Sequence, residues 1–198
     1  NLPAEHKMVA PYFTMLWAEQ MPVHRCVADS GGVTEVIGGV GAIDGASPPP
    51  PPQSWAADAA PGVQIWRVRM GPGAAWSLPP AAAGHGRMLY FYEGEKMAVD
   101  GMQVPAGTGL QLSPTAEVRL ENLGAAAELL LLSAQPIAEP VAQHGPFVMN
   151  TREELQEAYR DYQTTQFGGW PWPDDAPTHG PAKKRFARHS DGRVEEAS

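Results

Sequence analysis

The chain has 198 residues, a length that suits one sizeable hydrophobic core or one domain with long extensions. Its 21 glycines and 21 prolines predict many turns between short segments, which favours an all-β body over a helical bundle. The formal net charge of −8 argues against nucleic acid as the main partner, because phosphate binding requires clustered cations.

Residues 1–30 are predicted to form an extended arm, because prolines interrupt any long helix there. The arm carries Cys26, the single cysteine, which excludes an internal disulfide framework and fits a reducing, cytoplasmic setting. Cys26 stands two residues after His24, so the two side chains would share one face of a strand. We interpret this cysteine as structural and not as a nucleophile.

A short strand is predicted at Val33–Ile37, followed by a Gly-rich and Pro-rich excursion over residues 38–53. The consecutive prolines Pro48–Pro52 require polyproline II conformation. Such a run can serve as a docking ligand or as a stiff loop spacer. Docking ligands of this kind generally carry flanking basic residues and none lie nearby, so we favour the spacer.

From residue 63 to residue 133 the sequence reads as a series of strands with turns between them. Residues 63–70 alternate with period two, and residues 116–121 alternate between apolar and charged side chains. Asp100-Gly101, between two short apolar segments, is a strong hairpin signal. The body, about residues 60–135, is therefore predicted to be an antiparallel sandwich or small barrel.

Glu128–Ser133 is predicted to be the closing strand of this body. Its run of leucines falls far short of the roughly 20 apolar residues that a membrane span needs. No other stretch comes nearer to that length, and no signal peptide is visible, so no membrane partner is expected.

A helix is predicted at residues 151–166, inside a segment 146–168. Thr151 and Glu154 have the spacing of a capping box, in which each side chain accepts a hydrogen bond from the other residue's backbone N–H. An apolar stripe follows at i, i+3, i+4 and i+7, namely Leu155, Ala158, Tyr159 and Tyr162. Gly168-Gly169 is expected to end the helix.

Residues 169–198 form a tail rich in tryptophan, proline and charge. Trp170 and Trp172 are expected to be docked, because each buries a large apolar area. A basic cluster, residues 183–185 with Arg188, could contact an anion or nucleic acid. Because acidic residues follow it closely, we favour a solvated or poorly ordered tail.

Three segments carry a resemblance to a known family: the opening Asn1–Met8 (NLPAEHKM), the run Gln143–Thr151 (QHGPFVMNT) and the stretch Phe167–Pro173 (FGGWPWP). Together they resemble the second half of a pirin, a two-barrel member of the cupin superfamily. The resemblance implies an all-β fold, a cupin-like antiparallel β-barrel or sandwich with one C-terminal amphipathic helix and extended arms. Residues 31–145 would then be a degenerate cupin barrel.

Cupin barrels bind iron, manganese and similar metals through two motifs. The first has two His residues shortly before a Glu, with a Gly seven positions after that Glu, and the second is Pro-x-Gly followed by a His. Gly94 and Pro105-Ala106-Gly107 resemble the two skeletons, but Arg87 stands at the Glu position and Leu110 at the second-motif His position. His85 is left nearby, and one imidazole does not hold a divalent ion. The resemblance therefore predicts no metal, no cofactor and no catalytic residue in this chain.

In pirins the iron site belongs to the first barrel and is built from three His and one Glu. Some pirins act as quercetin 2,3-dioxygenases, and others bind transcription factors or other proteins as redox-sensitive regulators. The resemblance implies that this chain supports an iron-dependent dioxygenase site in a first barrel that the chain lacks, with Fe(II) as the cofactor there. The alternative is a non-enzymatic, redox-sensitive regulatory or protein-binding module.

Both ends of the chain carry more aromatic residues than a barrel of this length needs for its interior. Exposed apolar patches generally mark an interaction surface. We hypothesise that both ends lie against the first barrel of the same protein, and that the isolated chain self-associates. The candidate interface residues are Tyr12, Phe13, Trp17, Phe147, Met149, Trp170 and Trp172.

Overall fold

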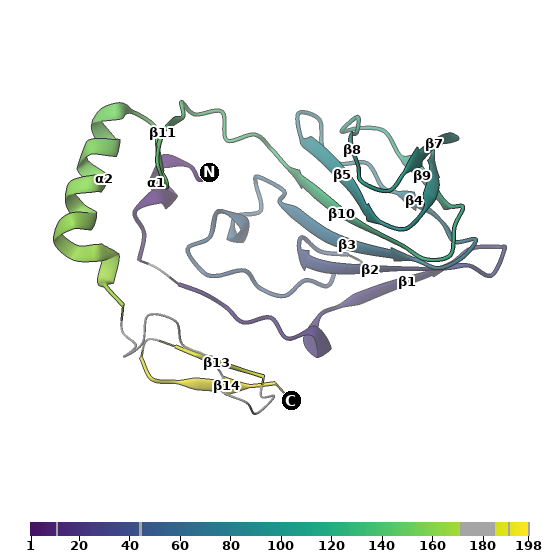
Figure 1. Cartoon of the computed structure of the whole chain (residues 1–198), viewed down its shortest axis with the longest axis horizontal. Helices are drawn as coiled ribbons and strands as arrows, with labels where there is room; N and C mark the ends of the chain where they lie inside the picture. The colour runs from purple at the N-terminus through teal and green to yellow at the C-terminus, as the bar shows by residue number, and fades with distance from the viewer. Residues whose placement is uncertain (11, 44, 171–184, 190, 198) are drawn as a thin grey trace. The chain divides into compact units, whose positions relative to one another are not determined.

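Two antiparallel sheets enclose the hydrophobic core of the computed structural model, which describes residues 1–10, 12–43, 45–170, 185–189 and 191–197 (Figure 1). The first sheet has the order β1-β2-β3-β10-β5-β8, with β1 Val23–Val27, β2 Val33–Val40, β3 Gln64–Met70, β10 Ala127–Ala134, β5 Gly86–Glu93 and β8 Thr108–Gln111. The second has the order β4-β9-β6-β7, with β4 Ala75–Leu78, β9 Val118–Asn122, β6 Lys96–Val99 and β7 Met102–Pro105.

The chain divides into two units by its internal contacts. Residues 10–137 contain both large sheets and are named the barrel unit. Residues 1–9 and 138–198 are named the terminal unit. The all-β prediction is confirmed, and α2 of the terminal unit is the C-terminal amphipathic helix that accompanied it.

The core of the barrel unit follows from period-two patterning on its strands. On β3, Trp66, Val68 and Met70 are buried while the residues between them face outward. Leu129 and Leu131 of β10 are fully buried on the same face, each worth about 1.5–3 kcal/mol of transfer free energy. The buried cluster is Val36, Trp66, Val68, Met70, Ala74, Leu78, Leu89, Phe91, Met97, Val99, Val104, Val118, Leu120, Ala127, Leu129 and Leu131.

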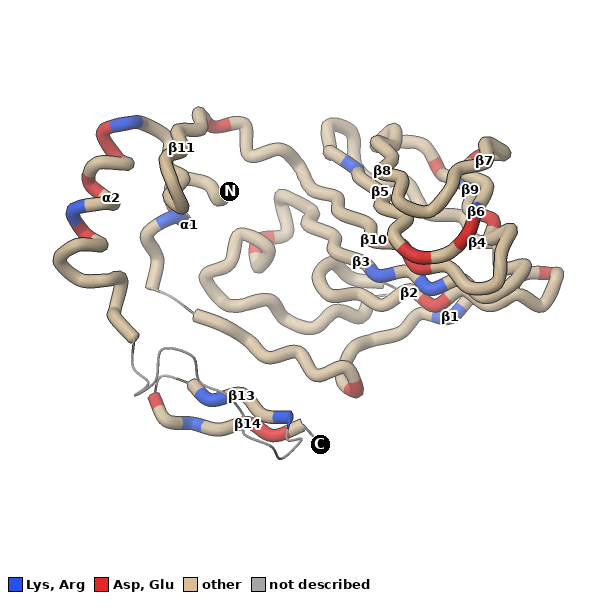
Figure 2. Tube along the Cα trace, viewed as in Figure 1, with Lys and Arg blue, Asp and Glu red and all other residues tan. Residues whose placement is uncertain are grey.

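A row of charges crosses the outer face of the six-stranded sheet. Arg25 lies opposite Glu35, Glu35 opposite Arg69, and Arg69 opposite Glu128, so the sign alternates from strand to strand. The blue and red segments on β1, β2, β3 and β10 in Figure 2 follow this row. Opposite charges across neighbouring strands favour this register over a one-residue slip, which would turn every side chain to the other face.

The predicted hairpin at Asp100-Gly101 is confirmed between β6 and β7. Asp100 has a φ of 48° and Gly101 a φ of 79°, the left-handed conformations that a two-residue type I′ turn requires. Asp100 also accepts a hydrogen bond from Arg119 N at 2.8 Å and donates its own N–H to Arg119 O at 2.9 Å. The turn is thereby tied to β9.

The first forty residues differ from the sequence prediction in two ways. Residues 23–27, placed in the extended arm, form β1 and pair along their length with β2. The strand predicted at Val33–Ile37 continues to Val40 with a register shift between Gly38 and Val40, because β3 pairs with it beyond the point where local propensity ends. The arm also contains the short helices α1 Ala4–Lys7 and η1 Ala18–Gln20, and η2 Trp55–Ala57 follows the Pro-rich excursion.

Among its described residues, the terminal unit contains two small hairpins and one longer helix, besides the short α1 and a 3₁₀ turn. The first hairpin pairs β11 Ala142–His144 with β12 Phe147–Met149, and the helix α2 spans Arg152–Thr165 before η3 Gln166–Gly168. Within the described residues, no helix has both the length and the apolarity that a membrane crossing needs.

The capping box at the start of α2 is confirmed. Thr151 Oγ1 accepts from Glu154 N at 3.2 Å, and Glu154 Oε2 accepts from Thr151 N at 3.0 Å. The segment 146–168 is not helical throughout, since β12 precedes the cap. The helix ends before the glycine pair because Gln166 and Phe167 adopt positive φ of 50° and 51°.

Part of the predicted solvated tail is ordered as a hairpin. Strands β13 Phe186–Arg188 and β14 Val194–Glu196 pair, and His189 Nε2 lies 2.8 Å from Glu195 Oε1. Arg188 of the predicted basic cluster therefore belongs to a strand. Lys183, Lys184 and Trp172 lie outside the described residues.

Candidate functional site

The two positions at which cupins carry metal ligands both face the interior of the barrel unit. Arg87 lies on β5, shares the inward face of the strand with the buried Leu89 and Phe91, and is only 1% exposed. Leu110 lies on β8 directly opposite Leu89 and packs against the core. These two positions thus point inward as ligands would, but they hold a guanidinium and an aliphatic side chain.

The guanidinium of Arg87 is held by backbone oxygens. Nη1 donates to Ser113 O at 2.8 Å and to Ala116 O at 2.9 Å, with Pro114 O further away at 3.3 Å, and Nη2 donates to Pro79 O at 2.7 Å. Burial lowers the pKa of Arg87 because desolvation disfavours the charged form, although a guanidinium stays protonated in proteins. No carboxylate pairs with Arg87 anywhere in the described part of the chain, and its Nε has no hydrogen-bond partner there.

His85 lies two residues before this arginine and contacts Ser133 and Gly62. Its Nδ1 is 3.5 Å from Ser133 Oγ, and Ser133 lies opposite Arg87 in the sheet. A Cβ on Gly62 would come within 2.6 Å of His85 Cε1, so the imidazole ring packs closely over this glycine, whose φ of 56° also favours Gly. Over the described ranges, no three His, Cys, Asp or Glu side chains come together in a way that could hold a metal ion.

His24 and Cys26 do share a strand face, as the sequence predicts. On β1 they alternate with exposed residues and lie opposite the buried Val36 and Thr34 of β2, with Cys26 Sγ 2.9 Å from His24 Nε2. The thiol is half-buried. Cys26 therefore lies on the inward-facing side of an edge strand, and its structural role stays a prediction.

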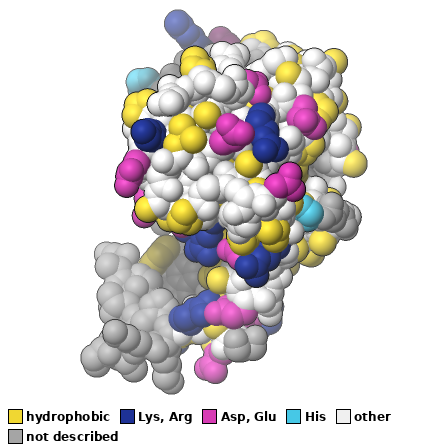
Figure 3. Space-filling model, turned by 90° about the vertical axis from the view of Figure 1, so that its right-hand side faces the viewer, with side chains coloured by type: hydrophobic (Ala, Val, Ile, Leu, Met, Phe, Trp, Pro, Cys, Tyr) yellow, Lys and Arg dark blue, Asp and Glu magenta, His cyan; other side chains and the backbone are white. Residues whose placement is uncertain are grey.

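A shallow groove of about 560 Å³ lies in the barrel unit between the β1–β2 turn and strands β4 and β9. Arg119 Nε lies 3.5 Å from Glu121 Oε1 in its wall, so these charges face each other. Figure 3 shows the face at the right of Figure 1, where charged side chains of both signs lie among small groups of hydrophobic ones. A mixed surface of this kind is typical of a solvated face.

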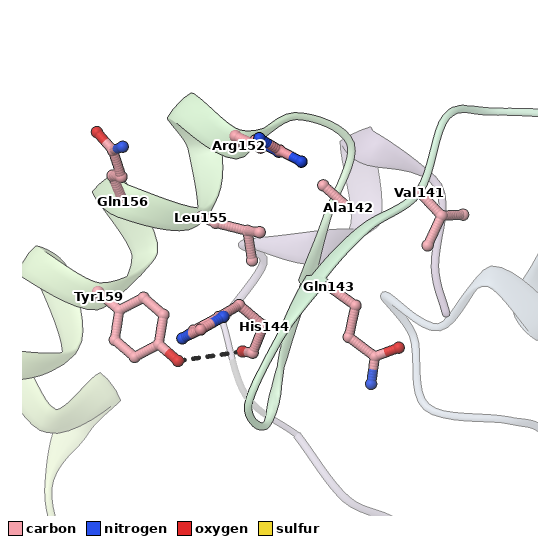
Figure 4. A pocket seen from close by; sticks show the side chains of 8 residues that line it. All are labelled: Val141, Ala142, Gln143, His144, Arg152, Leu155, Gln156 and Tyr159. Carbon is pink, nitrogen blue, oxygen red and sulfur yellow. Dashed lines mark hydrogen bonds between the residues drawn. The ribbon is translucent and has the colours of Figure 1, made fainter.

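A larger groove, of about 800 Å³, lies within the terminal unit between β11 and α2. Figure 4 shows Leu155 and Tyr159 projecting from the helix toward the hairpin, while Gln156 projects away from it. Tyr159 donates its hydroxyl to His144 O at 3.1 Å and closes one end of the groove. The sequence did not identify this groove, because it depends on how the hairpin folds back on the helix.

An aromatic cluster covers the adjoining part of the terminal unit. The ring of Phe147 meets Tyr159 at 4.6 Å between centroids, Tyr162 at 5.7 Å and Phe167 at 5.8 Å, all edge-on. Tyr162 and Phe167 remain 47% and 41% exposed. The apolar stripe of α2 is therefore buried at Leu155 and Ala158 but open to solvent toward its C-terminal end.

The candidate interface residues occupy different environments. In the barrel unit Tyr12 and Phe13 are 61% and 43% exposed, whereas Trp17 is buried at 8% and its surface is already covered. In the terminal unit Phe147 and Met149 are half-buried on β12, and Trp170 is 51% exposed. Trp172 lies outside the described residues.

Comparison with known proteins identifies the chain's relatives. The family model of the pirin C-terminal cupin domain matches residues 65–168. The chain belongs to the pirin family. The matched range runs from β3 through the aromatic cluster to the end of η3. It therefore includes Arg87 and Leu110 at the metal-motif positions and the groove between β11 and α2.

Two curated pirins and one solved structure are similar to this pirin-family chain. A pirin-like protein of Caulobacter vibrioides is 38% identical over 168 residues, which are 84% of this chain and 56% of that protein. The pirin of Rattus norvegicus is 46% identical over 52 residues, 26% of this chain and 18% of that protein. The crystal structure of a quercetin 2,3-dioxygenase from Acinetobacter baumannii superposes with a TM-score of 0.69 at 25% identity, covering 85% of this chain and 55% of that one. These matches cover most of this chain but only about half the length of the Caulobacter and Acinetobacter proteins.

Proposed function

We propose that this chain is the structural second half of a two-barrel pirin, and that its terminal unit docks on a first barrel that carries iron and a quercetin 2,3-dioxygenase-like site. The observation that carries this proposal is the composition of the terminal unit. Every residue of the hydrophobic core cluster belongs to the barrel unit. Among the described residues of the terminal unit, the buried nonpolar side chains are Pro3, Leu155, Ala158 and Ala187.

A 14-residue helix draws most of its stability from tertiary packing, and among the described residues the main contacts of α2 are with a small hairpin and η3. Covering the exposed parts of Tyr162 and Phe167 would be worth about 2 kcal/mol each before ordering costs, at ~25 cal/mol/Å² for rings of ~200 Å². A partner surface for this cluster is therefore expected. The chain spans 56% of the length of its Caulobacter relative, so the occupant that we assign is the other half of the same protein.

The barrel unit itself serves as a scaffold in this proposal. Neither Arg87 nor Leu110 can donate an electron pair to iron, so the residues at the motif positions do not fit the metal. We assign Fe(II) and its ligands to the first barrel. We propose a cytoplasmic location, in keeping with the single cysteine of this chain.

The dioxygenase reaction is proposed from the name of the Acinetobacter structure, which the chain matches over 85% of its length. The test compares this chain with the two-barrel protein, both free of purification tags, for iron content and for quercetin consumption with added Fe²⁺. Near-stoichiometric iron and turnover in the two-barrel protein, with neither in this chain, is the expected result. Near-stoichiometric iron in this chain alone would contradict the scaffold assignment. Iron without turnover in the two-barrel protein would favour a redox-sensitive protein-binding module instead.

A further inference from the structure

Backbone oxygens from two separate segments converge on one cation inside the barrel unit. Pro79 O lies just after β4, and Ser113 O, Pro114 O and Ala116 O lie between β8 and β9. Three of the four distances to the Arg87 nitrogens are between 2.7 and 2.9 Å. We name these four oxygens the carbonyl cage.

The cage arises from the prolines in these segments. Pro79, Pro80 and Pro114 contribute carbonyl acceptors but no N–H donors, so pairing between the two segments can satisfy only part of their oxygens. One backbone hydrogen bond does join them, from Ala81 N to Pro114 O at 2.8 Å. The remaining acceptors need donors from elsewhere, and a guanidinium supplies five donors and no acceptor.

The side chain that fills the cage comes from a strand between the two segments. Arg87 projects from the inner face of β5, and its own carbonyl accepts from Leu112 N at 2.9 Å, which fixes β5 beside the second segment. The positive charge faces carbonyl dipoles in place of a carboxylate. Such an arrangement stabilises a cation without a counter-ion, because each oxygen presents its negative end to the charge.

We propose that the carbonyl cage is a binding site for a single organic cation of the guanidinium class, which the chain occupies with its own Arg87. The cage joins the segment that follows β4 to the segment between β8 and β9, through a side chain of β5. This proposal rests on the barrel unit alone and stands whether or not the two-barrel function is correct.

The test removes the arginine side chain from the carbonyl cage by substitution and adds a small guanidinium compound to the solution. In Arg87→Ala, we expect the thermal midpoint to fall by on the order of 10 °C, because several charge-assisted hydrogen bonds are lost together. Methylguanidinium at low millimolar concentration should restore part of this loss in a saturable way. Tetramethylammonium at the same concentration, which has no N–H donors, should not. The matched control is Arg119→Ala, an exposed arginine on β9, which should show no such recovery.

Amide hydrogen exchange gives an independent readout. The Ala81 amide should lose at least tenfold protection in Arg87→Ala and regain it with methylguanidinium, while amides of β1 and β2 remain unchanged. If Arg87→Ala does not fold, its refolding yield with and without methylguanidinium decides the matter, and an increase supports the cage. Unchanged stability and protection in Arg87→Ala, no gain with methylguanidinium in stability, protection or yield, or equal recovery in Arg119→Ala, would each overturn the proposal.

Discussion

Replacing Glu128 by glutamine tests whether the charges on the outer sheet face stabilise the barrel unit. The carboxylate of Glu128 accepts from Arg67 Nε at 3.0 Å and from the Tyr92 hydroxyl at 2.6 Å, and Arg69 Nε lies 3.3 Å away. The side chain of Glu128 is 20% exposed, and those of Arg67 and Arg69 are 43% and 46% exposed. Hydrogen bonds to a charged group contribute ~1.5–3 kcal/mol when buried, and exposed ion pairs contribute less than ~1 kcal/mol. For this half-exposed network we expect Glu128→Gln to lower the free energy of unfolding by about 1–2 kcal/mol.

The effect of this substitution should depend on pH. Burial by itself raises the pKa of Glu128, but hydrogen bonds from Tyr92 and Arg67 and the charges of Arg67 and Arg69 outweigh it, so the net pKa is lowered from 4.5. A carboxyl whose pKa is lowered in the folded state contributes stability that is complete above its unfolded pKa. That contribution is lost as the pH falls through the folded pKa.

Urea unfolding of the wild type and Glu128→Gln between pH 7 and pH 3 measures both effects. The difference should be largest at neutral pH and should shrink below about pH 4.5. The matched control is Glu121→Gln, whose carboxylate is 45% exposed and has a single ion pair at 3.5 Å, and which should change stability by less than ~0.5 kcal/mol. A difference that stays constant over this pH range, or a Glu128→Gln variant as stable as the wild type, would refute the reasoning.

Three further outcomes are expected. Leu131→Ala should cost about 3–5 kcal/mol in urea unfolding because its side chain is fully buried, whereas Leu132→Ala, on the other face and 37% exposed, should cost less than about 1 kcal/mol; equal losses would contradict the assignment of inner and outer faces. Thr151→Ala should cost about 1 kcal/mol and speed amide exchange in the first turn of α2, while Thr164→Ala in its last turn should leave that turn unchanged. Light scattering at increasing concentration should detect self-association of the isolated chain and a weaker effect in Phe167→Ser, and a strictly monomeric wild type would argue against the docking surface.

Elements coded by neighbouring residues could be predicted from the sequence. The β6–β7 turn needs only Asp100-Gly101, and the start of α2 needs only Thr151 and Glu154, because each motif closes its hydrogen bonds within three or four residues. Strand β1 was missed because its five residues gain strand structure by pairing with β2, a relation that local propensity does not contain.

In the candidate site, too, local features could be predicted from the sequence and long-range ones could not. The sequence placed Arg87 and Leu110 at the motif positions, and alternation along β5 and β8 accounts for their facing inward. The carbonyl cage could not be foreseen, because its oxygens lie eight residues before Arg87 and 26 to 29 residues after it. Trp17 was grouped with the exposed aromatics on composition alone, but the fold covers it.

The position of β10 has a consequence for how the protein is made. This strand is the last to be synthesised in the barrel unit, yet it lies in the middle of the six-stranded sheet and pairs with β3 on one side and β5 on the other. Until the ribosome has released residues 127–134, both neighbours present open edges with unpaired N–H and C=O groups. A nascent or prematurely terminated chain therefore exposes two sites for intermolecular strand pairing at once, and a single late segment removes both.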